Sequence, residues 1–162
     1  MKAIVISDVD GCLTDGKYIY TADGKVAKTY GPHDNDGVKL LKKNNIDVVF
    51  ISADKRGFPI TKKRIEDMNC PIYNVSESER VDWVKNYIKD HGYEFAVFFG
   101  DGIGDVPVKP YVNMFIAPAN ARREAKAAAT FVTESEGGNG AFLDLALYVK
   151  DYLTTLHINY EH

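Results

Sequence analysis

Two pairs of aspartates follow short apolar segments of the sequence. Asp8 and Asp10 come at the end of the run Ala3–Ser7, and Asp101 and Asp105 follow a second apolar run. Carboxylates this close repel one another, so one of them has a raised pKa unless a cation keeps both ionised. Oxygen ligands suit a hard cation such as Mg2+, and neighbouring carboxylates can also divide into a nucleophile and an acid/base. A bare Asp-x-Asp is more often a polar turn, but four carboxylates at one sheet edge need a metal.

Two further residues are candidates for binding phosphate. Ser52 ends the apolar run Asp47–Ile51, where a hydroxyl and a backbone N–H could bind a phosphate oxygen. Arg80 lies near the start of a helical segment, where a cation could balance the aspartates and hold a phosphate. Taken alone, a serine in this place is more often a turn or cap residue, and such an arginine is usually solvated.

Four polar residues are candidates for contacting the rest of a substrate. His33 and Asp34 follow a predicted hairpin and could reach a leaving group, although a surface turn with a helix cap explains them equally well. Lys55 and Arg56 lie just beyond Ser52 and could meet an anionic or polyhydroxylated molecule, although solvated charges are the usual explanation.

Apolar, β-branched runs alternate with helical patterns along the chain, and this alternation must position the candidate residues. Continuous apolar strands that alternate with helices indicate a parallel sheet covered on both faces. We therefore expect an α/β fold with a doubly wound, Rossmann-like parallel sheet. The expected strands are Ala3–Ser7, Asp47–Ile51, Ala96–Phe99, Met114–Ala117 and Phe131–Val132, and the expected helices are Gly37–Asn44, Phe58–Met68, Glu79–His91, Asn120–Ala129 and Gly140–Leu153.

One segment, at about residues 17–30, interrupts the alternation. Lys17–Thr21 and Lys25–Tyr30 read as two short strands, and the Asp-Gly between them is a strong hairpin signal. The hairpin follows the first strand directly, so it lies at the carboxyl edge where ligands of such sheets bind. It is either a flap over the site or a surface decoration. Two-stranded ribbons are marginally stable alone, so we expect it to pack against another subunit.

Length and composition limit the architecture and the partners. The 162 residues match one ordinary domain, so we expect a single domain over 1–162 with no separate cap. Twenty basic residues against 23 acidic ones argue against nucleic-acid binding, and no apolar run is long enough for a membrane span. Lys2 comes too early for a signal peptide. Cys12 and Cys70 lack metal-ligand spacing, so we expect free thiols in a cytoplasmic protein.

The motifs together resemble the signature of the haloacid dehalogenase superfamily. The resemblance covers nearly the whole chain in order and extends to its capless subfamily, which contains 3-deoxy-manno-octulosonate 8-phosphate and nonulosonate 9-phosphate phosphatases. The hairpin contributes to the subfamily resemblance. The matching segments are Asp8-x-Asp10-Gly11-x-x-Thr14-Asp15-Gly16, Ser52, Arg80, Gly100-Asp101-x-x-x-Asp105, Tyr30-x-x-x-Asp34-x-x-Gly37 and Gly137-Gly138-x-Gly140-Ala141.

The resemblance implies roles for the four aspartates. Asp8 would attack phosphorus and form an aspartyl-phosphate, and Asp10 would protonate the leaving alcohol and then activate water. Mg2+ would be held by Asp8, Asp101 and the backbone carbonyl of Asp10, with Asp105 in or just behind that set of ligands. The transferred phosphoryl group would be bound by Ser52 and Arg80.

Three positions depart from the close relatives. Arg80 stands where they usually have lysine, and Ala53-Asp54 follows Ser52 where they usually have glycine. The segment Leu143-Asp144 stands where they tend to carry an arginine-glutamate pair. If that arginine binds an acidic sugar, its loss argues against a simple transfer of octulosonate specificity.

The expected function is a Mg2+-dependent phosphatase for a small sugar phosphate, in the synthesis of a bacterial surface polysaccharide. One alternative is a phosphatase for another polyol or sugar phosphate, and another is a catalytically silent oligomerisation domain. The resemblance implies a homotetramer. Without a cap, the site would be closed by the hairpin, a neighbouring subunit or the C-terminal tail.

Overall fold

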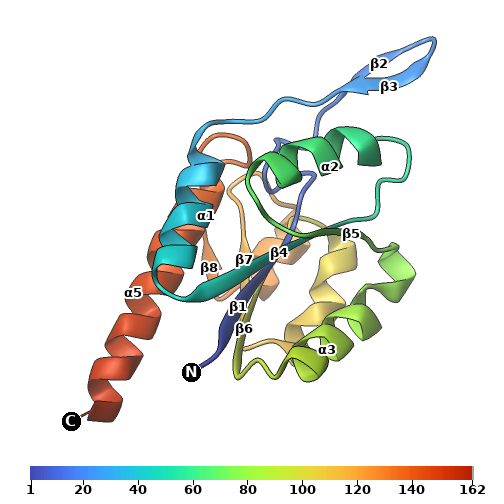
Figure 1. The fold of residues 1–162 in the computed structure, drawn as a ribbon. Helices are drawn as coiled ribbons and strands as arrows, with labels where there is room; N and C mark the ends of the chain where they lie inside the picture. The colour runs from blue at the N-terminus through green and yellow to red at the C-terminus, as the bar shows by residue number, and fades with distance from the viewer. Residues whose placement is uncertain (162) are drawn as a thin grey trace.

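A six-stranded parallel sheet forms the centre of the protein (Figure 1). This computed structural model describes the backbone of residues 1–161 and the side chains of residues 1–156. The strand order β5-β4-β1-β6-β7-β8 is that of a doubly wound sheet, as the alternation of apolar runs and helices predicted. The strands are β1 (Ala3–Asp8), β4 (Ile46–Ser52), β5 (Ile72–Asn74), β6 (Phe95–Phe99), β7 (Met114–Ala117) and β8 (Phe131–Val132).

Helices cover both faces of the sheet, and each face has its own apolar core. On one face, α1 (His33–Lys43), α2 (Phe58–Asp67) and α5 (Ala141–Glu161) bury residues such as Leu41 and Phe142 against the strands. The opposite face is covered by α3 (Arg80–His91), α4 (Arg123–Ala128) and the 3-10 segment η2 (Ile103–Tyr111). Because both faces are covered, the central strands are buried throughout and read as unbroken apolar runs.

Several element boundaries differ from the sequence-based expectation. Helix α1 begins four residues before Gly37, directly after Pro32, whose fixed φ suits a helix start. Helix α4 begins only at Arg123, because Arg122 has an extended ψ of 147°. The short edge strand β5 was not expected, since its three residues follow Pro71 and carry little pattern. A short 3-10 segment, η1 (Glu77–Glu79), precedes α3.

The predicted hairpin forms after the first strand and projects beyond the sheet (Figure 1). Its strands, β2 (Ile19–Thr21) and β3 (Gly24–Ala27), are shorter than expected. Apolar side chains on it remain exposed, among them Ile19 at 55% and Tyr20 at 60%. Its packing against another subunit stays a prediction. Across residues 1–161 no cap domain accompanies it, as expected from the length.

The strand register brings the carboxyl ends of β1, β4 and β6 together. Asp8 pairs with Ile51, the residue before Ser52, and Ser7 pairs with Phe99, two residues before Asp101. Helix α5 starts near the hairpin end of the molecule and runs to the opposite end (Figure 1), so its described part leads away from this edge. No helix within the described chain is both long and apolar enough to cross a membrane. Both cysteines are buried free thiols.

Candidate active site

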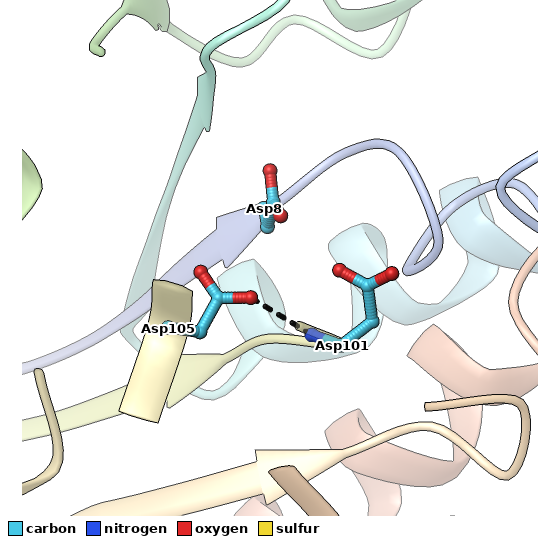
Figure 2. Close-up of side chains that lie close together, drawn as sticks. All are labelled: Asp8, Asp101 and Asp105. Carbon is cyan, nitrogen blue, oxygen red and sulfur yellow. Dashed lines mark hydrogen bonds between the residues drawn. The ribbon is translucent and has the colours of Figure 1, made fainter. Parts of the chain in front are cut away.

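Three carboxylates meet at this carboxyl edge. One oxygen from each of Asp8, Asp101 and Asp105 lies within 4.8 Å of the others, and Figure 2 shows the three side chains close together. Asp8 ends β1 and accepts a hydrogen bond from the Val9 amide at 2.9 Å. The oxygen-only donor set fits a hard divalent cation such as Mg2+. The two acidic pairs seen in the sequence therefore contribute three of their four side chains to one cluster.

Burial and mutual repulsion disfavour the charged forms of these carboxylates. Burial is the largest cause that raises the pKa of Asp8 well above its usual value, and Asp105 and Asp101 add to it. Burial and then Asp105 raise the pKa of Asp101 to about 6. Burial also raises the pKa of Asp105, against the opposing effect of Arg80. A bound cation would offset the free-energy cost of keeping these three carboxylates ionised.

Arg80 supplies positive charge beside the cluster. It starts α3, is 5% exposed, and donates from Nη1 to Asp105 Oδ1 at 2.6 Å. The other oxygen of Asp105 accepts from the amides of Asp101 and Gly102, each at 3.0 Å. The buried Nε of Arg80 has no hydrogen-bond partner among the described residues. Arg80 is thus fixed by Asp105, and its buried Nε is left without a partner among the described residues.

The loop after β1 approaches the cluster closely because residue 11 is glycine. Gly11 has a φ of +85°, and a Cβ there would lie 1.8 Å from Asp101 Oδ2. Thr14 Oγ1 accepts from the amides of Gly11 and Gly16, each at 3.1 Å. The Gly-x-x-Thr spacing therefore closes a tight loop that carries Asp10 and shapes one wall of the site.

Asp10 lies apart from the three clustered carboxylates. Its side chain, 35% exposed, pairs with Lys28 at 2.9 Å, and it is not among the residues whose oxygens converge. The carboxylate expected to act as acid/base is thus paired with a lysine from the hairpin segment. The expected use of its backbone carbonyl as a metal ligand stays a prediction.

Ser52 lies at the end of β4 with one hydrogen-bond donor available. Its Oγ accepts from the Asp54 amide at 3.2 Å, and its carbonyl accepts from Asn74 Nδ2 at 2.9 Å and from the Val75 amide at 3.0 Å. The hydroxyl proton has no acceptor among the described residues, so it is free to donate to an anion.

The four candidate substrate contacts differ in exposure. His33 is exposed and pairs with Asp36 at 3.4 Å, whereas Asp34 is fully buried and offers no surface to a substrate in this structure. Lys55 and Arg56 are exposed on the loop after Ser52, and neither forms an ion pair with a described residue. Contact of a substrate with Lys55 or Arg56 stays a prediction.

The sequence analysis did not identify two residues, Asn120 and Lys28, whose side chains bind the loops and carboxylates around the site. Asn120 donates from Nδ2 to the Gly11 carbonyl at 2.9 Å and accepts from the Gly137 amide at 2.7 Å, so it joins two glycine loops. Lys28 was part of a predicted strand with no role. The sequence placed Asn120 at the start of a predicted helix and gave Lys28 no distinguishing signal.

Relatives of known activity match the chain over most of its length. The 3-deoxy-D-manno-octulosonate 8-phosphate phosphatase KdsC of Haemophilus influenzae is 32% identical over 144 residues, 88% of this chain and 79% of the relative. The cobalt-bound deoxy-D-mannose-octulosonate 8-phosphate phosphatase YrbI of H. influenzae has a TM-score of 0.79 at 30% identity, covering 88% of this chain and 84% of that one. The Moraxella catarrhalis 3-deoxy-D-manno-octulosonate 8-phosphate phosphatase, solved with magnesium ion, phosphate ion and KDO, shares the fold with a TM-score of 0.80 at 22% identity, covering 97% and 92%. No protein-family profile matches the chain.

The fold, the hairpin and the carboxylate site define a hydrolase of the haloacid dehalogenase superfamily. Within that superfamily, the identity to the H. influenzae enzyme over 88% of the chain shows that the chain belongs to the KdsC family of phosphatases. It is accordingly a phosphoric monoester hydrolase. The resemblance inferred from the motifs is confirmed.

Proposed function

We propose that the chain is a Mg2+-dependent phosphatase that hydrolyses a small sugar phosphate through an aspartyl-phosphate on Asp8. The observation that carries this proposal is the convergence of the Asp8, Asp101 and Asp105 oxygens within 4.8 Å, beside Arg80. Three carboxylates that can hold a cation, with a guanidinium beside them, suit phosphoryl transfer, which depends mainly on in-line positioning and electrostatic neutralisation.

Asp8 and Asp10 carry the two halves of the reaction. The Asp8 carboxylate attacks phosphorus, the bond from phosphorus to the leaving oxygen breaks, and Asp10 gives its proton to that oxygen. Water then attacks the phosphorus of the aspartyl-phosphate, and Asp10 accepts a proton from that water. Inorganic phosphate leaves and the Asp8 carboxylate is regenerated. Burial of Asp8 at 9% exposure favours this chemistry, because it limits the water around the acyl phosphate.

The metal would be held by the side chains of Asp8, Asp101 and Asp105 together with the backbone carbonyl of Asp10. The all-oxygen donor set and the raised pKa of each carboxyl support a divalent cation here. When bound, Mg2+ would supply Lewis-acid polarisation of the phosphoryl oxygens. A cobalt-bound form of the H. influenzae enzyme agrees with a divalent site.

Ser52 and Arg80 would bind the phosphoryl oxygens. The free proton of the Ser52 hydroxyl and the positive charge of the Arg80 guanidinium beside Asp105 support this assignment. Because Arg80 already donates to Asp105, it would act as a fixed cation rather than a mobile one.

The substrate is proposed to be a 3-deoxy-2-ulosonic acid phosphate or a related sugar phosphate, in the synthesis of a bacterial surface polysaccharide. The names of the relatives support this class. A specific observation favours the alternative of a neutral polyol or sugar phosphate. Asp144 accepts from the Ser135 amide at 2.9 Å and Leu143 is apolar, so this segment presents no cation to a sugar carboxylate.

Phosphate release from a matched panel tests the proposal. We expect Mg2+-dependent release from sugar phosphates, removal of activity by a chelator and recovery on adding Mg2+. The panel compares a 3-deoxy-2-ulosonic acid phosphate with neutral sugar phosphates of similar size. Preference for the acid supports the first substrate class, and preference for the neutral sugars supports the second. Failure to release phosphate from any monoester would leave the silent oligomerisation domain as the better explanation.

The protein is further proposed to be a cytoplasmic homotetramer whose hairpins pack between subunits. The exposed apolar side chains of the hairpin, including Tyr18, Ile19 and Tyr20, support an interface. Light scattering is expected to give the mass of four chains, and Ile19→Lys with Tyr20→Lys is expected to shift the mass toward smaller species. A monomer at working concentration would contradict the assembly.

A further inference from the structure

A lysine ammonium is completely buried between the hairpin and the loop that carries Asp10. Lys28 lies just after β3, and its side chain is 0% exposed. Removing an ammonium from water is costly unless partners replace the hydration shell. Arg80 pairs with one carboxylate of the cluster, Asp105, but Lys28 contacts none of the three converging carboxylates. Its buried charge is therefore unexplained by the metal site.

The Lys28 ammonium has three protons and three polar partners. It contacts the Asp10 carboxylate at 2.9 and 3.1 Å, Asp54 Oδ2 at 2.8 Å and Thr61 Oγ1 at 2.9 Å. Burial alone would lower the pKa of Lys28, but the hydrogen bonds to Asp54 and Asp10 outweigh it and raise that pKa. With every donor in use, Lys28 has no donor left for a substrate phosphate.

Two of the three partners, Asp54 and Thr61, belong to the segment from the end of β4 to α2. Asp54 accepts from the Gly57 amide at 3.0 Å and from Lys25 at 2.8 Å, and Thr61 is fully buried in α2. Gly57 allows this packing, because a Cβ there would lie 2.3 Å from Asp54 Oδ2. The ammonium is thus held from one side by the β4–α2 region.

Asp10 is the most exposed of these three partners. Its side chain is 35% exposed, against 13% for Asp54. Both Asp10 oxygens lie within 3.1 Å of the same ammonium, so the contact fixes the position and the plane of the carboxylate. Without Lys28, the loop of Asp10 has no described side-chain partner that orients this carboxylate.

We infer that Lys28 is a positioning residue that holds Asp10 in place for proton transfer to the leaving alcohol. This inference rests on the proposed function. As the proton moves from Asp10 to the departing oxygen, negative charge appears on Asp10 beside a fixed ammonium. Because Lys28 belongs to the hairpin segment, the position of the Asp10 carboxyl depends on how the hairpin packs against the domain.

Leaving-group dependence tests this role. The ratio kcat/KM covers only the steps up to departure of the alcohol, so it isolates the acid function of Asp10. An aryl phosphate releases a stable phenolate that needs little protonation, whereas an alkyl sugar phosphate needs the acid. For Lys28→Met, we expect kcat/KM to fall about 100-fold on the alkyl ester and less than about fivefold on p-nitrophenyl phosphate.

Lys25→Met is the matched control. Lys25 also pairs with Asp54 but has no bond to Asp10, so we expect the alkyl-to-aryl ratio to stay within about threefold of the wild type. Equal losses on both substrates in Lys28→Met, or an equal change of the ratio in Lys25→Met, would overturn the inference. If Lys28→Met does not fold, Thr61→Val replaces it. We expect an alkyl-selective loss there too, and an unchanged ratio overturns the role.

A measurement without turnover separates this inference from the proposed function. Amide hydrogen exchange in the segment 9–16 is expected to rise in Lys28→Met and to stay at the wild-type level in Lys25→Met. If the wild type hydrolyses no monoester, the proposed function fails while the exchange result still decides whether Lys28 positions Asp10. Unchanged exchange in Lys28→Met rejects the positioning role whatever the activity.

Discussion

Asp8→Asn is expected to reduce phosphate release by at least about 1,000-fold without unfolding the protein, because the amide removes the nucleophile and keeps its shape. Asp8 is one of three carboxylates whose oxygens lie within 4.8 Å of one another. Since burial and the neighbouring aspartates disfavour its charge, we also expect the metal-free variant to melt at a higher temperature than the metal-free wild type. Thermal unfolding in chelator, with phosphate release in Mg2+, measures both effects.

Asp23→Asn is the matched control, because Asp23 is an exposed aspartate in the hairpin turn. We expect it to keep wild-type activity and melting temperature. A second measurement separates a nucleophile from a mere metal ligand. Acid-quenched Asp10→Asn treated with an aryl phosphate should carry one phosphoryl group, and the Asp8→Asn/Asp10→Asn double variant should carry none. A phosphorylated double variant would show that another residue is the nucleophile.

The buried strands and the aspartates at their ends could be predicted from the sequence, because both follow from local pattern. Strands such as Ala3–Asp8 are unbroken apolar runs because both sheet faces are covered. The aspartates stand where those runs end, and parallel strands bring such ends to one edge. This is why Asp8, Asp101 and Asp105 could be expected together from residues nearly one hundred positions apart.

The contacts that tune the site depend on packing that no local pattern encodes. Asn120 reaches Gly11 across 109 residues, and Lys28 reaches Thr61 across 33. A lysine in a predicted hairpin is ordinarily solvated, so nothing in the local pattern predicted that Lys28 would be buried. Arg80 was expected beside the aspartates, but its 2.6 Å contact with Asp105 depends on how α3 seats against η2.

Asp34 was expected to contact a substrate, but its side chain is fully buried, the largest departure from expectation among the candidate residues. It lies in the first turn of α1, and neither carboxylate oxygen has a partner among the described residues. Burial raises its pKa to about 7, against the opposing influence of Arg64 and His33. The folded protein therefore binds this proton more tightly than the unfolded chain does. Its contribution to the free energy of unfolding falls as pH rises from about 4 to about 7.

Asp34→Asn is expected to remove this pH dependence, because the amide does not ionise. A shift of roughly three pKa units corresponds to about 4 kcal/mol as an upper bound. The difference in free energy of unfolding, variant minus wild type, should therefore increase by a few kcal/mol from pH 4 to pH 8. Urea unfolding at several pH values measures the difference, and carboxyls common to both proteins cancel in it. Asp36→Asn changes an exposed side chain on the same turn, and it should show the wild-type dependence of the free energy of unfolding on pH. If Asp34 instead stays ionised by pairing with Arg64, the variant would be less stable than the wild type at neutral pH, and the buried carboxyl would be an ion-pair partner rather than a proton-binding group.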